Sequence, residues 1–482
     1  MSVLKNTTAT SSNMAQSPLA VGALLGGTAV ILGIVLAFGG PIAGAALLVA
    51  GIAAFIILRD IEVGFWGVIL VVCLLPFATI PIDIGVIPTF LDVALGTVVG
   101  VWLLGIVTGR QKSISTSSIT LPLILFILIA IFSFIFGIPN GPLTPTLLRK
   151  FAELLLSLGF VVVIIDYCHN WERLERVTKV LLLAGAAASF IGIVFWILPD
   201  ELTNQLLNIL TRIGYPGGWV IRYIEEDPSR AERAIGTSVD PNVLGGLLLM
   251  LGALAGPQLM AKRPLFSRWL IVCIVGLIFL AIVLTFSRSA MIGLAFGLGY
   301  VAILRYRRLI PYMFLVGVLF LLLPVTQEFV VSRFLEGFQG QDLATQMRFG
   351  EYRDALRLIQ RYPTFGVGFA GAPDIDLYLG VANVYLTIAQ SMGLVGLLFF
   401  FSVILTLFGD AYLKRSWYVE NPERDAIWLG LHAAIVGGLV AGLFDHYLFN
   451  LEFHHAVTIF WLIIGLASAS TRLSSIQPDS PK

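Results

Sequence analysis

Apolar runs of about 15 to 25 residues follow one another between residues 19 and 469, and only two long polar segments interrupt them. A run of about 20 apolar residues crosses the roughly 30 Å hydrocarbon core of a bilayer as a helix. Composition agrees, since 58% of the residues are hydrophobic and 12% are charged, whereas soluble domains have roughly 25% charged residues. We therefore predict an all-α, polytopic transmembrane helix bundle of about 12 to 14 spans. The expected spans are 19–38, 42–58, 63–80, 91–109, 121–138, 151–165, 177–198, 241–260, 269–286, 289–304, 309–324, 383–407, 426–444 and 455–469.

Lysine and arginine predict the orientation of these spans. Cations in short loops mark the cytoplasmic side of a membrane protein, and their alternation here favours two cytoplasmic termini. This orientation places two long segments, 199–240 and 325–382, on the outer face. Residues 1–18 are rich in Ser, Thr and Asn, a composition typical of a disordered tail. The expected regions are a disordered cytoplasmic tail (1–18), an N-terminal transmembrane scaffold (19–198), an outer loop (199–240), central transmembrane helices (241–324), a large outer catalytic loop (325–382), C-terminal transmembrane helices (383–469) and a cytoplasmic tail (470–482).

Arginines stand at the edges of spans near the first long loop. In RAIGTSVDPN, Asp240 followed by Pro241 predicts a helix N-cap with proline at the first helical position. Arg233 lies just before this helix, and Arg288 stands between two apolar runs in FSRSAMIG. A guanidinium fork binds diphosphate oxygens in pairs and keeps its charge at any relevant pH. Two such side chains can cradle a diphosphate, with Arg230 as a further substrate contact, although Arg288 can equally mark a turn beside lipid headgroups.

The second long loop contains a helix signal that ends at Pro363. An apolar stripe with spacings of 3, 4 and 3 predicts an amphipathic interfacial helix, formed by Phe349, Tyr352, Leu356 and Ile359. Arginines recur along another face, either as contacts for an anionic lipid-linked substrate or as a solvated face. The candidate substrate contacts on this helix are Arg348, Arg353, Arg357 and Arg361.

Four features occur in a fixed order: RAIGTSVDPN, TFSRSAMIGL, an Arg-rich helix followed by YPTFGVGFA, and a closing span. This order resembles the O-antigen ligase and O-antigen polymerase superfamily. In ligases the closing motif is His, then Asn, Ser or Gln, then nine residues and Gly-x-x-Gly. Here Asn383 is followed by nine residues and by Gly393-Leu394-Val395-Gly396, but Ala382 stands where ligases have the histidine.

The resemblance implies a metal-independent glycosyltransferase of the C-type membrane architecture that uses no cofactor. Such enzymes move a glycan, with inversion, from an undecaprenyl diphosphate carrier to a hydroxyl of a glycan, lipid or protein acceptor. They work at the outer face of the bacterial plasma (inner) membrane, among membrane lipids, in the assembly of surface polysaccharides such as lipopolysaccharide. By position, Arg233 and Arg288 match the arginines that hold the diphosphate, and Asn383 belongs to the closing motif.

Because Ala382 replaces the motif histidine and alanine cannot transfer a proton, the identity of the general base is left open. Carboxylates of the outer segments are candidates, although each can equally be a cap, an ion-pair partner or a solvated group; they are Asp240, Glu351, Asp374 and Asp376. In FDHYLFNLEFHH, His446 beside Asp445 is an alternative base or substrate contact. His454 and His455 match no usual zinc spacing, so we expect them to be polar anchors at the membrane interface.

Two other classes of function compete with the transferase. A lipid-linked glycan flippase or secondary transporter is built from repeats around ionisable residues near the bilayer midplane. No such repeat is evident, and most charged residues lie near the ends of spans. A purely structural assembly subunit is the third possibility. Nucleic-acid binding is not expected, because a net charge of +1 provides no concentrated basic surface.

Overall fold

The structure is a computed structural model that describes residues 56–80, 85–111, 113–322, 343–373 and 380–475. The expected tail 1–18, the span 19–38 and all but residues 56–58 of the span 42–58 lie outside these residues. The helices are α2 (Ile61–Leu74), α3 (Phe90–Val107), α4 (Thr120–Gly137), α5 (Pro145–Tyr167), α6 (Trp171–Ile197), α7 (Asp200–Ile209), α8 (Pro241–Ala255), α9 (Arg268–Leu284), α10 (Arg288–Leu304), α11 (Leu309–Leu322), α14 (Leu343–Arg361), α15 (Val384–Glu420), α16 (Pro422–Ala441) and α17 (His454–Leu473). One antiparallel ribbon pairs β1 (Arg222–Tyr223) with β2 (Glu232–Arg233).

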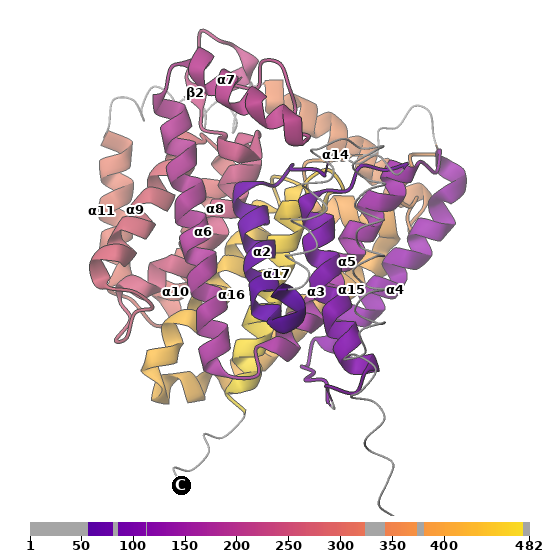
Figure 1. Ribbon diagram of the computed structural model, residues 1–482. Helices are drawn as coiled ribbons and strands as arrows, with labels where there is room; N and C mark the ends of the chain where they lie inside the picture. Colours follow the sequence, from indigo (N-terminus) through magenta and orange to yellow (C-terminus); the bar gives the residue numbers. More distant parts are fainter. Residues whose placement is uncertain (1–55, 81–84, 112, 323–342, 374–379, 476–482) are drawn as a thin grey trace, which may run out of the picture.

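The fold is an all-α helical bundle, as predicted (Figure 1). A helix coincides with each expected span from 63–80 onward. In the described part of the chain, 7 helices are long and apolar enough to cross a membrane: α3, α4, α6, α8, α15, α16 and α17. Three apolar helices are shorter, namely α2, α9 and α10. The chain is therefore a multi-pass membrane protein, while its total number of spans stays a prediction because residues 1–55 are outside the description.

Burial separates a central group of helices from a peripheral one. In the apolar windows of α8 and α17, 89% and 94% of the residues are buried, but only 17% are buried in α3. Peripheral helices expose large apolar side chains, such as Leu121 on α4 and Leu405 on α15, which are 66% and 70% exposed. Such surfaces are unfavourable in water and suit lipid contact, so α8, α16 and α17 form the core on which the site is built.

Small residues let α10 and α16 approach closely. A Cβ atom added at Gly293 would lie 2.6 Å from the carbonyl oxygen of Gly437, and one at Gly297 would lie 2.7 Å from that of Ala433. Membrane helices lack a hydrophobic driving force against one another and instead associate through such close backbone packing. This contact fixes the start of α10, and hence Arg288, relative to the end of α16.

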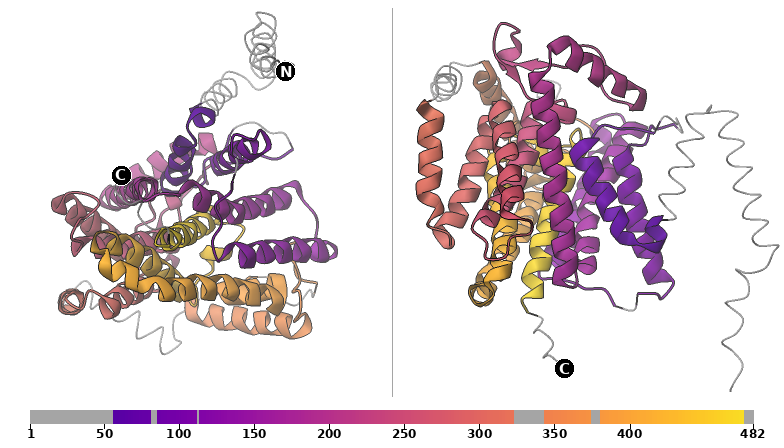
Figure 2. Two further views of the ribbon diagram at one scale, coloured as in Figure 1. Left: turned by 90° about the horizontal axis from the view of Figure 1, so that it is seen from below. Right: turned by 60° about the vertical axis from the view of Figure 1, so that its left-hand side comes forward.

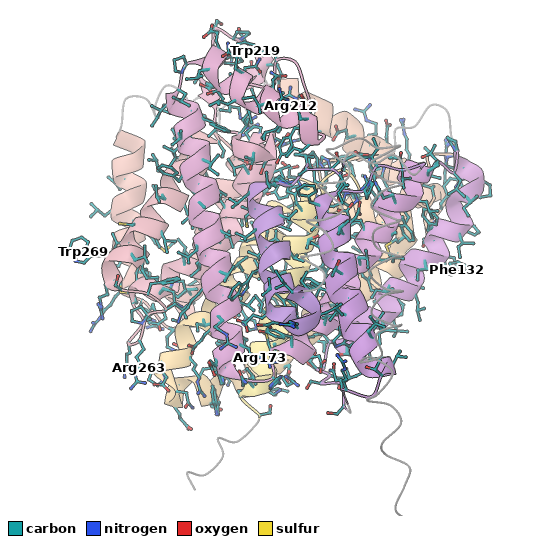
Figure 3. All side chains as sticks on the ribbon, in the orientation of Figure 1. Phe132, Arg173, Arg212, Trp219, Arg263 and Trp269 are labelled. Carbon is teal, nitrogen blue, oxygen red and sulfur yellow. The ribbon has the colours of Figure 1, made fainter. Side chains whose placement is uncertain are left out.

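The two long polar segments lie at the same end of the bundle. Figure 1 shows α7, β2 and α14 at the top, whereas α17 ends at the bottom. Figure 2 shows α7 lying across this end, and α14 packs alongside α15. Arg212 and Trp219 mark the same end in Figure 3, and Arg173 and Arg263 lie toward the opposite one. We call the end formed by α7, the β1–β2 ribbon and α14 the loop end.

Candidate active site

At the turn between α9 and α10, one predicted diphosphate-binding arginine, Arg233, contacts the backbone just before the other, Arg288. Arg288 is the first residue of α10, and Phe286 in the preceding turn has a positive φ of 50°. The Arg233 guanidinium reaches this turn, where its Nε donates a hydrogen bond of 2.9 Å to the carbonyl oxygen of Thr285. Its Nη2 donates to Oδ1 of Asn242 at 2.8 Å. Arg233 therefore joins the β1–β2 ribbon to the starts of both α8 and α10.

Asp240 caps α8, as the Asp-Pro pair predicted. Its Oδ1 accepts hydrogen bonds from the backbone N–H groups of Asn242 at 2.8 Å and Val243 at 3.0 Å. Burial raises the pKa of Asp240 and the carboxylate of Asp445 adds to this, while the two N–H groups and Arg233 act in the opposite direction. Asp240 thus has a structural role at the helix start, and it lies within electrostatic reach of Asp445.

Asp445 and His446 form a pair in the segment between α16 and α17. Nδ1 of His446 lies 3.4 Å from Oδ1 of Asp445, which also accepts the backbone N–H of His446 at 2.9 Å. Asp445 is buried, with 5% of its surface exposed. Burial lowers the pKa of His446, but the carboxylates of Asp445, Glu351 and Asp240 outweigh it, so the net pKa is raised. Three carboxylates therefore act on this histidine: its neighbour Asp445, and Glu351 and Asp240 from two other parts of the chain.

Helix α14 binds the backbone at the position where ligases have the motif histidine. Oε2 of Glu351 accepts a hydrogen bond from the backbone N–H of Ala382 at 3.0 Å, and the Tyr352 hydroxyl donates to the Ala382 carbonyl at 3.3 Å. Asn383 caps α15 by accepting the N–H of Leu386 at 2.9 Å, and its Nδ2 donates to the carbonyl of Leu443 at 2.9 Å. These contacts tie the start of α15 to the end of α16 beside His446.

A cavity of about 480 Å³ opens beside this junction. Its walls come from the start of α5, from α14, from the first turns of α15 and from the segment before α17. Glu351, Ala382 and His446 all line it. The fold therefore collects a potential base and a carboxylate at a cavity, and the base lies within electrostatic reach of Asp240 at the start of α8, which Arg233 contacts through Asn242.

A comparison with known protein families finds a match for the part of the chain that contains α10, α14 and the first turns of α15. Residues 273–401 match a family model described as O-antigen ligase. They form an O-antigen ligase domain. The predicted resemblance to the O-antigen ligase superfamily is thereby confirmed over these residues. No curated protein sequence matches the chain. Arg288, Glu351 and Asn383 lie inside the matched residues, whereas the fold supplies Arg233 and His446 from outside them.

The Gly-x-x-Gly spacing of the O-antigen ligase domain marks a break in α15. Gly393 has φ 69° and ψ −175°, so the helix is interrupted there. The segment 363–368 fills the break: the N–H of Val367 donates to the carbonyl of Gln390 at 2.8 Å, and the N–H of Leu394 donates to that of Pro363 at 2.7 Å. Backbone groups released by the break are satisfied by this loop, as a membrane-embedded irregular segment requires. The segment 363–368 thus supports the cavity wall, and we call it the wedge.

Replacing Gly393 with Ala is expected to lower the free energy of unfolding by about 2–4 kcal/mol, because the positive φ disfavours a side chain and the site is closely packed. A Cβ atom there would lie 2.1 Å from the carbonyl oxygen of Thr364. Gly409 in the same helix is the matched control, since its Cβ would meet nothing within 4 Å. The midpoint of thermal unfolding in detergent measures both variants. Equal midpoints for G393A and G409A would contradict the wedge.

Several predicted substrate contacts are not among the residues that line the cavity. Arg230 pairs with Glu225 at 2.9 Å in the loop between β1 and β2. Arg353, Arg357 and Arg361 lie on the exposed face of α14. Phe349 and Leu356 of the predicted apolar stripe are also exposed, at 56% and 51%, while Ala355 and Leu358 pack against the bundle. Asp374 and Asp376 lie outside the described residues.

Among the α14 arginines, Arg348 acts electrostatically on two tyrosines near the cavity, Tyr352 and Tyr447. Burial raises the pKa of Tyr352, and the Arg348 charge acts in the opposite direction. The same charge lowers the pKa of Tyr447, which burial raises well above its usual value. Arg348 therefore acts electrostatically on Tyr447, the neighbour of His446, and on the tyrosine that contacts Ala382.

The expectation that His454 and His455 anchor at a membrane interface was wrong. Both are buried, at 7% and 1% exposure. Nδ1 of His454 lies 3.2 Å from Oε2 of Glu153, and its Nε2 is 3.0 Å from the carbonyl oxygen of Lys150. The sequence pattern missed this because the partners come from α5, some 300 residues earlier in the chain. Within the described residues, no group of three His, Cys, Asp or Glu side chains is placed to hold a metal ion.

Sequence reasoning also missed Gln390 and the ion pair between Lys150 and Glu452, all of which line the cavity. Gln390 had a recognisable signal, because it is a polar side chain inside the apolar run 383–407. Lys150 and Glu452 had none, since only the packing of α17 against α5 brings them together.

Proposed function

We propose that this protein is a glycosyltransferase that moves a glycan from an undecaprenyl diphosphate carrier to an acceptor hydroxyl. The loop end would face the outside of a bacterial plasma membrane, with both termini in the cytoplasm and with surface polysaccharide as the product. The acceptor is a hydroxyl of a glycan, a lipid or a protein. The O-antigen ligase domain at residues 273–401 supports the general class of activity.

One observation carries this proposal: Arg233 contacts the turn before Arg288, and its charge acts on Asp240, which also lies within electrostatic reach of the Asp445–His446 pair at the cavity. The start of a helix attracts anions through its N–H groups and its dipole. Two guanidinium groups at such a helix start suit a diphosphate, whose negative charge increases as the sugar leaves.

The proposed reaction is a single displacement at the anomeric carbon of the donor sugar. The acceptor oxygen forms a bond to this carbon as the bond from the carbon to the diphosphate oxygen breaks, which inverts the configuration. Undecaprenyl diphosphate leaves with the bonding electron pair, and Arg233 and Arg288 stabilise its charge. The proton of the acceptor hydroxyl passes to a base.

We assign the base to His446, with Asp445 holding its ring. Nδ1 faces Asp445 at 3.4 Å, which leaves Nε2 as the nitrogen that can accept a proton. His446 and Ala382 line the same cavity, so the histidine stands close to the position that ligases fill with their motif histidine. Glu351 is engaged with the Ala382 backbone and Asp240 with the start of α8, which suits both to positioning.

The test uses full-length protein in nanodiscs supplied with an undecaprenyl diphosphate glycan and candidate acceptors. Acceptor-dependent release of undecaprenyl diphosphate, together with a glycosylated acceptor, is the expected result. Movement of the intact lipid-linked glycan across a proteoliposome membrane without any release would instead identify the flippase or transporter alternative. Neither release nor transport, in the presence of donor and acceptor from the native polysaccharide, would favour an assembly subunit.

A further inference from the structure

The wall of the cavity at the loop end includes a buried amide, that of Gln390. Gln390 lines the cavity and is only 1% exposed. Among the residues that the structure describes, neither Nε2 nor Oε1 of Gln390 has a hydrogen-bond partner. Burying an amide without partners is costly, and buried polar groups in proteins are almost always satisfied. Among the described residues, the amide therefore keeps its full hydrogen-bonding capacity at the wall of the cavity.

The backbone around Gln390 holds the amide in a fixed place. Its carbonyl oxygen accepts the N–H of Val367 at 2.8 Å, and the carbonyl of Ser391 accepts the N–H of Gly368 at 3.0 Å. Both residues stand in the last turn before the break at Gly393. The wedge 363–368 thus fixes the residue that carries the unsatisfied group, which is the arrangement expected of a preorganised binding residue.

The other walls of the cavity combine hydroxyls, amides and aromatic rings. Thr387, Ser391 and Asn450 provide polar groups, and Phe369 and Phe449 provide apolar faces with ring centroids 6.5 Å apart. Both cationic groups of the lining face a carboxylate, because Lys150 binds Glu452 and His446 lies 3.4 Å from Asp445. A volume of about 480 Å³ is within the range of small-molecule sites.

This lining fits a neutral, polyhydroxylated ring better than an anion or an acyl chain. A sugar hydroxyl both donates and accepts hydrogen bonds, and a glutamine amide does the same with its NH₂ and carbonyl groups. Aromatic side chains suit the apolar C–H faces of a sugar ring. A phosphate would require cations that are not already paired, and an acyl chain would leave the amide unsatisfied.

We propose that this cavity binds one sugar ring of a glycan and that Gln390 hydrogen-bonds the hydroxyls of that ring. The proposal rests on the proposed glycosyl transfer, because His446 lies at the same cavity. A sugar held there would present a hydroxyl or an anomeric carbon to the histidine. The ring can belong to the acceptor glycan or to the donor glycan, and the two sources share this recognition chemistry.

The key variant is Gln390→Leu, which replaces the amide with an apolar side chain of similar size. Because the amide makes no hydrogen bond among the described residues, Q390L should keep or raise the midpoint of thermal unfolding. The same change should weaken sugar binding at least about tenfold, because the sugar hydroxyls lose their partner. A merely structural glutamine would lower the unfolding midpoint and leave sugar binding unchanged.

Binding is measured without turnover, by saturation-transfer NMR on protein in nanodiscs. The probes are the methyl glycosides of glucose, galactose, mannose, rhamnose and N-acetylglucosamine. Transfer to at least one of them in wild type, and its loss in Q390L, is the expected result. No transfer to any probe in wild type, or equal transfer in Q390L, overturns the proposal.

Two further measurements show whether the ring belongs to the donor or the acceptor, and whether the sugar subsite exists independently of transferase activity. Under turnover, a raised KM for the acceptor in Q390L identifies an acceptor subsite, and a raised KM for the donor identifies a donor subsite. The variant Arg288→Ala should keep glycoside binding while losing transfer. Glycoside binding in wild type without any transferase activity would retain the subsite and reject the proposed function.

Discussion

Replacing Arg288 with Ala is expected to lower the turnover of undecaprenyl diphosphate release at least about 100-fold, which is the usual loss when a charge-stabilising group is removed. Arg288 is the first residue of α10, and Arg233 donates a hydrogen bond to the turn before it. The leaving diphosphate gains charge in the transition state, so a missing guanidinium raises the barrier more than it weakens ground-state binding. Steady-state release of the carrier from nanodiscs measures kcat and KM separately.

Arg212→Ala is the matched control for Arg288→Ala. Arg212 is an exposed arginine at the same loop end, as Figure 3 shows, so it tests whether any cation near the outer surface supports turnover. Arg288→Lys should recover only part of the rate, because an ammonium group lacks the planar fork that binds two oxygens. Turnover in R288A within about threefold of R212A would reject the diphosphate clamp, since such a difference is below 1 kcal/mol.

Hydropathy and helix-end signals predicted most of the fold. Each described span lies on a helix because apolar runs favour helices in a membrane, and Asp240 before Pro241 located the start of α8. The end of α15 was not predicted, since the expected span 383–407 stops where the apolar run stops while the helix continues to Glu420. The break at Gly393 was present in the sequence only as a spacing of glycines. Its cause lies in the carbonyl of Thr364, which is close to Gly393 only in the folded chain.

The site was predictable to the extent that it follows local rules. Arg233 and Arg288 were identified because each stands at the edge of a span, and the structure brings Arg233 to the turn before Arg288. The approach of Asp240, at the start of α8, to His446 was not predictable, because it depends on how α16 packs against α8 and α10. The arginine stripe on α14 was conspicuous in sequence, but helix geometry turns it outward and turns Glu351 toward the cavity.

Replacing His446 with Ala is expected to lower kcat by about 100- to 10,000-fold, the usual contribution of a general base. The base must be neutral to accept the acceptor proton, so activity in wild type should rise with pH through the pKa of His446. Carboxylates raise this pKa above the usual value, with Asp445 contributing most and Glu351 and Asp240 adding to it. The acidic limb of the kcat profile should therefore lie at higher pH than for a histidine with the usual pKa.

The variant Asp445→Asn tests whether His446 acts as the base or only packs in the fold. Removing the Asp445 charge lowers the pKa of His446, so the acidic limb should shift to lower pH while kcat at its plateau also falls through loss of ring orientation. Exposed His169, at the opposite end of the bundle, provides the control H169A. Because Ala382 lines the same cavity as His446, Ala382→His in the H446A background should restore part of kcat. An acidic limb that stays in place in D445N, with H446A as active as H169A, would assign the base to another group.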